Sequence, residues 1–414
     1  MEKRPLRHRW MWMFLSVGVG LWLGGVTGAA EAATLQVANN GVDSAVCGPV
    51  ASPCRSISKA IANAAPGDTI LVGAGAYGDL DADGTFTPAT GEEAAEVGFG
   101  CECMIKVDKP LTIISRDGAD ATVLDATQAV GAVVKIQASG VVFGLPKRGF
   151  TLWRGVSGGV VIDAPADVRV AGNIAKFIGT ACPCPPGTLG SGFIVTGGTG
   201  HVLTGNLSAN NVHQGFTVDG SGHTLSRNLV VDVGGAGFFV LGIGHTASRN
   251  ISNNIGGAGF AFDGTGHVIS DNVTGASGGF QIFGAGHTVK GNVSSGNYAA
   301  SPGFWIAGSG HAVSRNAARG NEGPGIYVNP GSSALTITQN DLYGNGRHDT
   351  LTGVPNCGLF NDSGTTITAT DNFWGAATGP GPDPADDVCN GSGSTTITSP
   401  FATTEFPVPT FSIF

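Results

Sequence analysis

Three aspartates at alternating positions form the clearest candidate for metal chemistry in this sequence. Asp79, Asp81 and Asp83 are followed directly by Gly84. Carboxylates at positions 1, 3 and 5 with glycine at position 6 are typical of the first half of a calcium-binding loop. Position 12 of such a loop is Thr90 here and not glutamate, and no helix is expected after it. The sequence therefore predicts a Ca²⁺ site in a loop that is not an EF-hand, with a solvated acidic loop as the alternative. The predicted ligands are Asp79, Asp81, Asp83, Thr85 and Glu92.

A histidine preceded by Gly-x-Gly recurs along the middle of the chain, and imidazole both titrates and binds metals. Its positions are His201, His223, His245, His267, His287 and His311. An asparagine follows each of them five residues later, and Asn340 continues that row. Imidazoles stacked at the roughly 4.8 Å spacing of paired strands cannot all be charged. We expect neutral, structural histidines and a ladder of asparagine amides in preference to a metal cluster.

The spacing of these histidines is 22, 22, 22, 20 and 24 residues, which defines a repeat. One unit, GFTVDGSGHTLSRNLVVDVGGA, contains three short stretches of alternating apolar residues, at Phe216, His223 and Leu229. Such alternation is typical of half-buried strands, and a unit this short must stack on its neighbours to bury its apolar side chains. We predict an all-β protein, a single-stranded right-handed parallel β-helix with about 22 residues per turn. A leucine-rich repeat would need an L-x-x-L-x-L frame, which is absent, and a β-propeller would need a longer repeat.

The rest of the chain divides by composition and spacing. Residues 55–65 are the best helix candidate, because Ile57, Ile61 and Ala64 share one face and Pro66-Gly67 follows. Such a helix would cap the N-terminal end of the solenoid. The predicted parts are a signal peptide at 1–32, a cap and first turn at 33–78, irregular turns with long loops at 79–190, regular repeats at 191–346, and C-terminal turns and a tail at 347–414.

The first 32 residues have the pattern of a secretory signal. Four basic residues lie within 2–9, residues 10–26 are apolar, and Ala30-Glu31-Ala32 resembles a cleavage site. A membrane anchor is the alternative, since the apolar run is close to the lower length limit for a span. We expect a periplasmic or extracellular protein with no transmembrane segment after signal removal.

Charge and composition restrict the partners. Glycine accounts for 69 of 414 residues, and 41% of residues are apolar, which excludes a disordered chain. Removal of residues 1–32 takes away four basic and two acidic residues and leaves 17 basic against 28 acidic ones, a net charge of −11. That is too little positive charge for a nucleic-acid partner. The negative balance also argues against anionic membranes and strongly anionic polymers.

The cysteines all follow the predicted signal peptide, where an even number favours disulfide bonds. Local pairs Cys47–Cys54 and Cys357–Cys389 are expected. The pairing within the remaining set stays open, although bonds between the two C-x-C loops are more plausible than a strained bond within one, and a four-thiolate metal site is the alternative. That set is Cys101, Cys103, Cys182 and Cys184.

Side-chain parity predicts an outer face on the strands that begin at Gly-Phe. If Phe216 and Val218 point inward, residues 217 and 219 point outward. The same offsets along the stack give a first row of Thr217, Phe239, Ala261, Gln281, Trp305 and Tyr327, and a second row of Asp219, Leu241, Asp263, Phe283, Ala307 and Asn329. The corresponding rows of the histidine strand are mostly serine and threonine.

Aromatic planes beside polar groups suit sugar rings, which have an apolar face and a hydroxyl rim. We therefore predict a glycan-binding face, unless loops or another subunit cover these rows. The candidate residues are Asp219, Phe239, Asp263, Gln281, Phe283, Trp305 and Tyr327.

Three segments carry a family resemblance: CGPVASPCRSISKAIANAAPGDTILVGAGAYGD, the GHTLSRN-type repeats, and DNFWGAATGPGP. Together they resemble the secreted right-handed parallel β-helix proteins of bacteria, in the pectate-lyase-like superfamily. The resemblance covers nearly all of the chain after the signal and implies the fold. It does not imply one activity, because that superfamily includes polysaccharide lyases, hydrolases, epimerases and adhesins.

Enzymes of that superfamily carry motifs that this chain lacks, namely N-T-D, G-H-G, W-i-D-H and D-P-H. Asp386-Asp387 is a D-D pair, but we expect it to lie in the tail without partners. The leading hypothesis is a secreted β-helix surface protein, structural or polysaccharide-binding and without catalysis. The alternative is a polysaccharide lyase or glycoside hydrolase with an unrecognised site, and the sequence leaves open whether the protein is an enzyme.

Overall fold

The computed structural model describes residues 31–96, 102–127, 130–179, 190–346, 356–381 and 384–407. The chain forms two units, Met1–Glu31 and Ala32–Phe414. The helices and strands of the described residues all belong to the second unit, and the predicted signal peptide lies outside the described residues except for its last two positions. No helix among the described residues combines the length and apolar character needed to cross a membrane.

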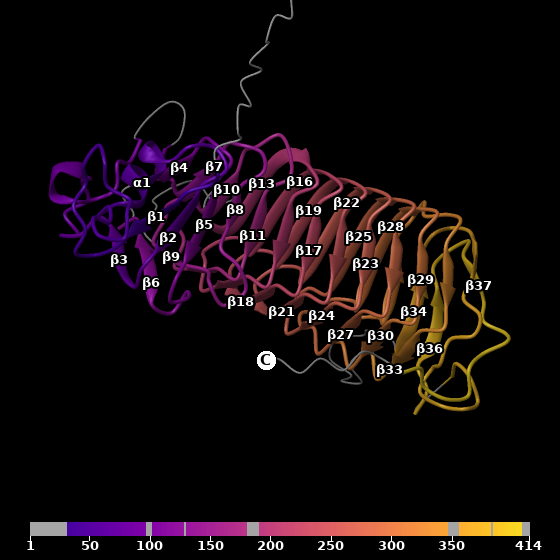
Figure 1. The fold of residues 1–414 in the computed structure, drawn as a ribbon. Helices are drawn as coiled ribbons and strands as arrows, with labels where there is room; N and C mark the ends of the chain where they lie inside the picture. The colour runs from indigo at the N-terminus through magenta and orange to yellow at the C-terminus, as the bar shows by residue number, and fades with distance from the viewer. Residues whose placement is uncertain are drawn as a thin grey trace, which may run out of the picture. The chain divides into compact units, whose positions relative to one another are not determined.

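The second unit is built from three long parallel sheets, named A, B and C here. Each turn of the regular region runs from a strand of sheet C to one of sheet A and then one of sheet B, as β16, β17 and β18 do. Figure 1 shows these strands following one another in chain order from α1 to β37. The predicted all-β parallel β-helix with three strands per turn is confirmed.

Sheet A contains β1 (Thr34–Val37), β2 (Thr69–Val72), β5 (Thr112–Ser115), β8 (Val142–Phe143), β11 (Arg169–Ala171), β14 (Val202–Thr204), β17 (Thr224–Ser226), β20 (Thr246–Ser248), β23 (Val268–Ser270), β26 (Thr288–Lys290), β29 (Ala312–Ser314), β32 (Thr336–Thr338), β35 (Thr366–Thr368) and β37 (Thr395–Ile397). Sheet B contains β3 (Gly75–Gly78), β6 (Thr122–Asp125), β9 (Thr151–Trp153), β12 (Ile174–Lys176), β15 (Leu207–Ala209), β18 (Leu229–Val233), β21 (Ile251–Ile255), β24 (Val273–Gly275), β27 (Val293–Ser295), β30 (Ala317–Arg319) and β33 (Asp341–Tyr343). Sheet C contains β4 (Cys103–Val107), β7 (Ala132–Ile136), β10 (Gly158–Ile162), β13 (Ser191–Thr199), β16 (Phe216–Ser221), β19 (Phe238–Ile243), β22 (Phe260–Thr265), β25 (Phe280–Ala285), β28 (Phe304–Ser309), β31 (Ile326–Val328), β34 (Cys357–Asn361) and β36 (Asp387–Asn390).

The predicted capping helix is present as α1 (Ile57–Asn63), two residues shorter than expected at each end. Ser56 is its N-cap and accepts a hydrogen bond from the Lys59 amide, while the buried Glu93 carboxylate accepts the Ile57 and Ser58 amides. These acceptors satisfy N–H groups that a helix N-terminus leaves unpaired. The helix packs on β1, β2 and β4, the N-terminal strands of sheets A and C.

The interior of the regular region is a stack of like residues. Rings of Phe216, Phe238, Phe260 and Phe280 lie parallel with centroids 4.7–4.8 Å apart from one turn to the next. Each ring is fully buried. Because register is exact from turn to turn, one apolar position in the repeat produces one continuous column of the core.

The predicted asparagine ladder is confirmed and is longer than the repeat itself. Each side-chain Oδ1 accepts both the backbone N–H and the Nδ2 of the ladder asparagine one turn earlier, as Asn250 does for Asn228 at 3.0 Å for both contacts. The ladder runs through Asn173, Asn206, Asn228, Asn250, Asn272, Asn292, Asn316, Asn340 and Asn372. The residue directly before a ladder asparagine can have a left-handed backbone even where it is not glycine, as at Arg227 with φ 54° and Arg249 with φ 57°.

A second ladder ends at a residue for which we expected no partners. Asn297, Asn321 and Asn345 are linked by backbone N–H to Oδ1 bonds, and the Asn345 N–H and Nδ2 both donate to Asp386 Oδ2. Asp386 Oδ1 also accepts the Gly344 amide, and the side chain is buried. The expectation for Asp386 is therefore wrong: the carboxylate replaces the next ladder amide at the C-terminal end.

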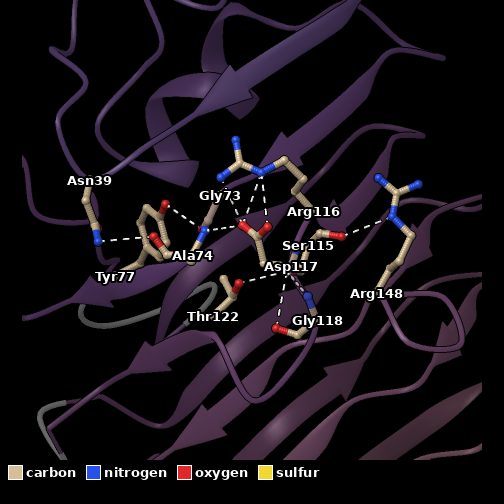
Figure 2. A network of polar contacts seen from close by, with 10 residues as sticks. All are labelled: Asn39, Gly73, Ala74, Tyr77, Ser115, Arg116, Asp117, Gly118, Thr122 and Arg148. Carbon is tan, nitrogen blue, oxygen red and sulfur yellow. Dashed lines mark hydrogen bonds and ion pairs between the residues drawn. The ribbon is translucent and has the colours of Figure 1, made fainter.

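Polar contacts also connect successive turns near the N-terminal end. The Asp117 carboxylate accepts the Ala74 amide at 2.8 Å and pairs with Arg116 (Figure 2). The buried Tyr77 hydroxyl donates to the Gly73 carbonyl, and burial raises the pKa of this phenol to about 12. These groups hold the β2–β3 corner against the turn that follows it.

The disulfides Cys47–Cys54 and Cys357–Cys389 are formed as predicted. Cys103 is also disulfide-bonded. Cys101, Cys182 and Cys184 lie outside the described residues. The pairing among these three and Cys103 therefore stays an open prediction.

Candidate functional site

The first outer row of sheet C is aligned by strand pairing in the predicted register. Thr217 pairs with Phe239, and the row continues through Ala261, Gln281, Trp305 and Tyr327. It extends one turn further than expected, because Tyr327 pairs with Phe360 of β34. The irregular spacing between Tyr327 and Phe360 interrupts the repeat, and this is why sequence reasoning missed Phe360.

Four aromatic side chains, named the aromatic ridge here, join the two outer rows. Their rings meet edge to face: Phe283 with Trp305 at 6.0 Å and 88°, Trp305 with Tyr327 at 5.8 Å and 83°, and Tyr327 with Phe360 at 5.5 Å and 75°. Each side chain is half-buried. Edge-to-face contacts restrain each ring, so the ridge is a rigid aromatic surface.

Polar groups accompany the ridge. The Tyr327 hydroxyl donates to Asp362 Oδ2 at 3.0 Å, and partial burial together with that carboxylate raises the pKa of Tyr327. Trp305 Nε1 has no hydrogen-bond partner among the described residues. Phe360 lies in β34, and Asp362 is the residue that follows this strand. The C-terminal end of the ridge is therefore its most polar part.

The two predicted acids, Asp219 and Asp263, lie on the second row in turns that precede Phe283. Asp263 pairs with Leu241 on one side and Phe283 on the other. Asp219 and Asp263 are both exposed, and two turns separate them, which corresponds to about 9.6 Å at the usual strand spacing. No ion pair involves either carboxylate among the described residues.

The histidine ladder lies directly beneath this second row. From His223 onward each Nδ1 accepts the backbone N–H of the ladder histidine one turn earlier, for example His245 Nδ1 from His223 N–H at 3.1 Å, whereas the Nδ1 of His201, the first in the row, accepts the Val168 N–H. The ring proton is therefore on Nε2, which faces the carbonyl four residues earlier. Those carbonyls belong to Asp219, Leu241, Asp263, Phe283 and Ala307.

Ring stacking and burial keep these histidines neutral. Neighbouring centroids lie 4.7–5.0 Å apart. Burial lowers the pKa of all six, to about 4 for His223, where the adjacent rings add to the effect. The rings lie at the corner before each sheet A strand and not within it, because the histidine N–H binds a ring nitrogen in place of a strand carbonyl. The ladder is structural, and it anchors the backbone of the second outer row.

A pair of aromatic side chains beside sheet B, one at the end of β9 and one directly after β12, was not anticipated. Trp153 and Phe177 are stacked at 5.8 Å with an interplanar angle of 29°, and both are more than one-third exposed. Both residues precede the regular repeat, so the inward and outward alternation of the 22-residue unit could not be used to predict that they are exposed. They form a second exposed aromatic surface.

The acidic loop brings together three of its five predicted ligands. One carboxylate oxygen each from Asp79, Asp81 and Glu92 lies within 4.8 Å of the others. Asp83 instead accepts the Thr85 amide at 2.7 Å and the Thr85 hydroxyl at 2.6 Å, so these two residues satisfy each other.

Comparison with known proteins supports the fold. The family model for the right-handed β-helix region matches residues 214–374. No curated protein sequence matches the chain significantly. Together with the three parallel sheets, the family match confirms the predicted right-handed parallel β-helix.

Two solved structures show similar backbones at low sequence identity. The catalytic domain of Agl-KA has a TM-score of 0.52 and 12% identity, with 80% of this chain and 63% of that chain covered. The catalytic domain of a GH87 α-1,3-glucanase in complex with nigerose has a TM-score of 0.52 and 12% identity, with 83% and 67% covered. At this identity the likeness concerns the fold alone.

Proposed function

We propose that this protein is exported and binds polysaccharide through the outer face of sheet C. The observation that carries the proposal is the aromatic ridge of Phe283, Trp305, Tyr327 and Phe360. Half-buried rings that restrain one another lose little conformational freedom when a ligand binds, which favours affinity. Sugar rings stack on such surfaces through their apolar faces, while Asp362, Gln281 and Asp263 offer partners for hydroxyl groups.

Neutral polysaccharides suit the site better than anionic ones. The whole chain has a formal net charge of −9, and the acids nearest the ridge carry the same sign. Like charges oppose the approach of a polyuronate or sulfated chain. The expected ligand class is therefore a neutral glycan on a cell surface or in a matrix.

Hydrolysis is the alternative activity on the same face. Asp219 and Asp263 are exposed and about 9.6 Å apart by strand spacing, near the upper end of the separation that inverting glycosidases use. Both known structures described above are catalytic domains. A reducing-end assay on each bound polysaccharide separates the two activities, and Asp263→Asn tests the acid if turnover is found.

Binding is tested first with the full exported chain on an array of neutral and acidic polysaccharides. The variant Trp305→Ala/Tyr327→Ala is expected to weaken binding at least about tenfold, or ~1.4 kcal/mol. The matched control is Trp153→Ala, which removes an exposed ring from sheet B and should bind like the wild type. Loss of binding in the control alone would transfer the site to sheet B, and binding unchanged in the double variant would refute the proposal.

A further inference from the structure

We propose that the loop between β3 and β4 binds one Ca²⁺ through Asp79, Asp81 and Glu92, and that Asp83 and Thr85 are not ligands. One oxygen of each ligand lies within 4.8 Å of the other two. Three carboxylates this close repel one another unless a cation or a proton lies between them. No ion pair joins any of the three to a lysine or arginine in the described part of the chain.

The loop is already shaped around these oxygens. The Gly84 amide donates to Asp79 Oδ2 at 2.8 Å, and the Leu80 and Thr87 amides donate to the two oxygens of Glu92 at 2.7 and 2.6 Å. Gly84 has φ +84°, the left-handed conformation that a sharp loop requires and that glycine adopts without strain. The carboxylates of Asp79 and Glu92 are thus held inside the loop before any ion is bound, while Asp81 is exposed beside them.

The decisive atom is Asp79 Oδ1. Asp79 is only 6% exposed, and its Oδ1 has no hydrogen-bond partner among the described residues. A buried carboxylate oxygen without a partner is costly, and a cation between Asp79, Asp81 and Glu92 would remove that cost. In an ordinary acidic turn this oxygen would be solvated, so its burial without a partner favours an ion site over a solvated loop.

The chemistry of the ligands selects the ion. Carboxylate oxygens without nitrogen or sulfur ligands favour a hard cation, and Ca²⁺ tolerates an irregular shell completed by backbone carbonyls and water better than Mg²⁺ does. Asp83 is excluded because it does not belong to the group of three carboxylates, and its Oδ1 instead accepts both Thr85 donors. Thr90, at the twelfth loop position, donates to the Thr87 carbonyl within the short 3-10 helix Pro88–Thr90. That helix displaces the last acidic ligand to Glu92.

Ion binding would also reach the N-terminal cap. The neighbouring Glu93 is fully buried, and its carboxylate accepts the amides of Ile57 and Ser58 at the start of α1. Fixing Glu92 on an ion therefore fixes the backbone that presents Glu93 to the helix. Ca²⁺ should stabilise α1 as well as the loop.

The test is calorimetric titration of the chelator-treated full exported chain with CaCl₂. The proposal predicts one ion per chain for the wild type and for Asp83→Asn, and at least about tenfold weaker binding for Asp81→Asn, since affinity follows the number of charged ligands. Asp81 is exposed, so its substitution should leave the fold intact, which circular dichroism checks. Hydrogen exchange of α1 should slow when Ca²⁺ is added.

Three results would overturn the proposal. They are no binding by the wild type, equal binding by Asp81→Asn, and a loss in Asp83→Asn as large as that in Asp81→Asn. None of these outcomes depends on glycan binding, so the ion site and the sheet C face succeed or fail separately.

Discussion

The buried ladders and the outer face of sheet C belong to the same turns of the solenoid and obey opposite rules. Along each ladder one residue type persists from turn to turn, as phenylalanine, histidine and asparagine do. On the outer face the residue changes at every turn, from Phe239 to Ala261, Gln281 and Trp305.

The difference has a physical cause. In the ladders each side chain is the hydrogen-bond or stacking partner of its copy in the next turn, so a change at one turn leaves two neighbours without partners. Outer side chains other than the buried Ala261 are at least partly exposed, and they carry no such restriction. Repetition therefore marks the residues that hold the solenoid together, and departures from repetition mark the surface where a specific function can reside.

The largest effect is expected in the phenylalanine column. Phe260→Ala should destabilise the protein by about 3–5 kcal/mol, because it removes a fully buried ring between two stacked neighbours and leaves a cavity. The midpoint of urea unfolding measures this change. A shift equivalent to less than about 1 kcal/mol would show that the column is not a main source of stability.

The asparagine ladder should be nearly as sensitive. Asn250→Ala removes the acceptor of the Asn228 N–H and Nδ2 and leaves the Leu225 carbonyl without its side-chain donor. Each buried group left unpaired costs about 1–3 kcal/mol. The same unfolding experiment measures the loss, and an unfolding midpoint like that of the wild type would contradict the structural role of the ladder.

Acid should act on the histidine ladder. Burial lowers the folded-state pKa of each ladder histidine, to about 4 for His223, below the ordinary value of about 6.5. The unfolded chain therefore binds more protons, and stability present above about pH 6.5 is lost as the pH falls toward 4. Each titrating histidine contributes about 1.4 kcal/mol per pH unit.

Thermal unfolding across this pH window and histidine NMR titration check that prediction. Replacing the exposed Lys290 with alanine is a control that should leave the pH profile unchanged. Histidines that titrate near 6.5 in the folded protein would contradict the account, because a protonated Nδ1 cannot accept the N–H of its neighbour.

The smallest effect on stability is expected for a substitution on the outer face of sheet C. Gln281→Ala, on the first outer row between Ala261 and Trp305, should change the unfolding free energy by no more than about 0.5 kcal/mol, as surface substitutions usually do. A loss as large as that of Asn250→Ala would abolish the distinction between the ladders and the outer face.

The repeat made most of the fold predictable. Because His, Asn and Phe recur at fixed offsets, parity alone assigned the inner columns and the outer rows, and the confirmed ladders follow from the same offsets. The helix was placed correctly but predicted too long, since Ser56 and Glu93 determine its start through contacts that helical periodicity does not reveal.

Features between the repeats could not be derived in this way. The left-handed backbone at Arg227 and Arg249 is maintained by the ladder that follows and not by a residue type that favours it. Asp386, Phe360 and the Trp153–Phe177 pair all follow irregular spacings, so their partners depend on how insertions fold back. In the acidic loop the sequence indicated five ligands. Contacts within the loop instead bring Asp79, Asp81 and Glu92 together and pair Asp83 with Thr85.

Hydroxyl-radical footprinting of the exported chain, with and without a polysaccharide that it binds, tests the central claim most directly. We predict that bound glycan lowers the oxidation of Trp305 and Tyr327 on sheet C, while Trp153 and Phe177 on sheet B are oxidised as in the free protein. All four side chains are at least partly exposed, so each reports on its own surface. Protection of Trp153 and Phe177, with Trp305 and Tyr327 oxidised as before, would contradict the assignment of function to the outer face of sheet C.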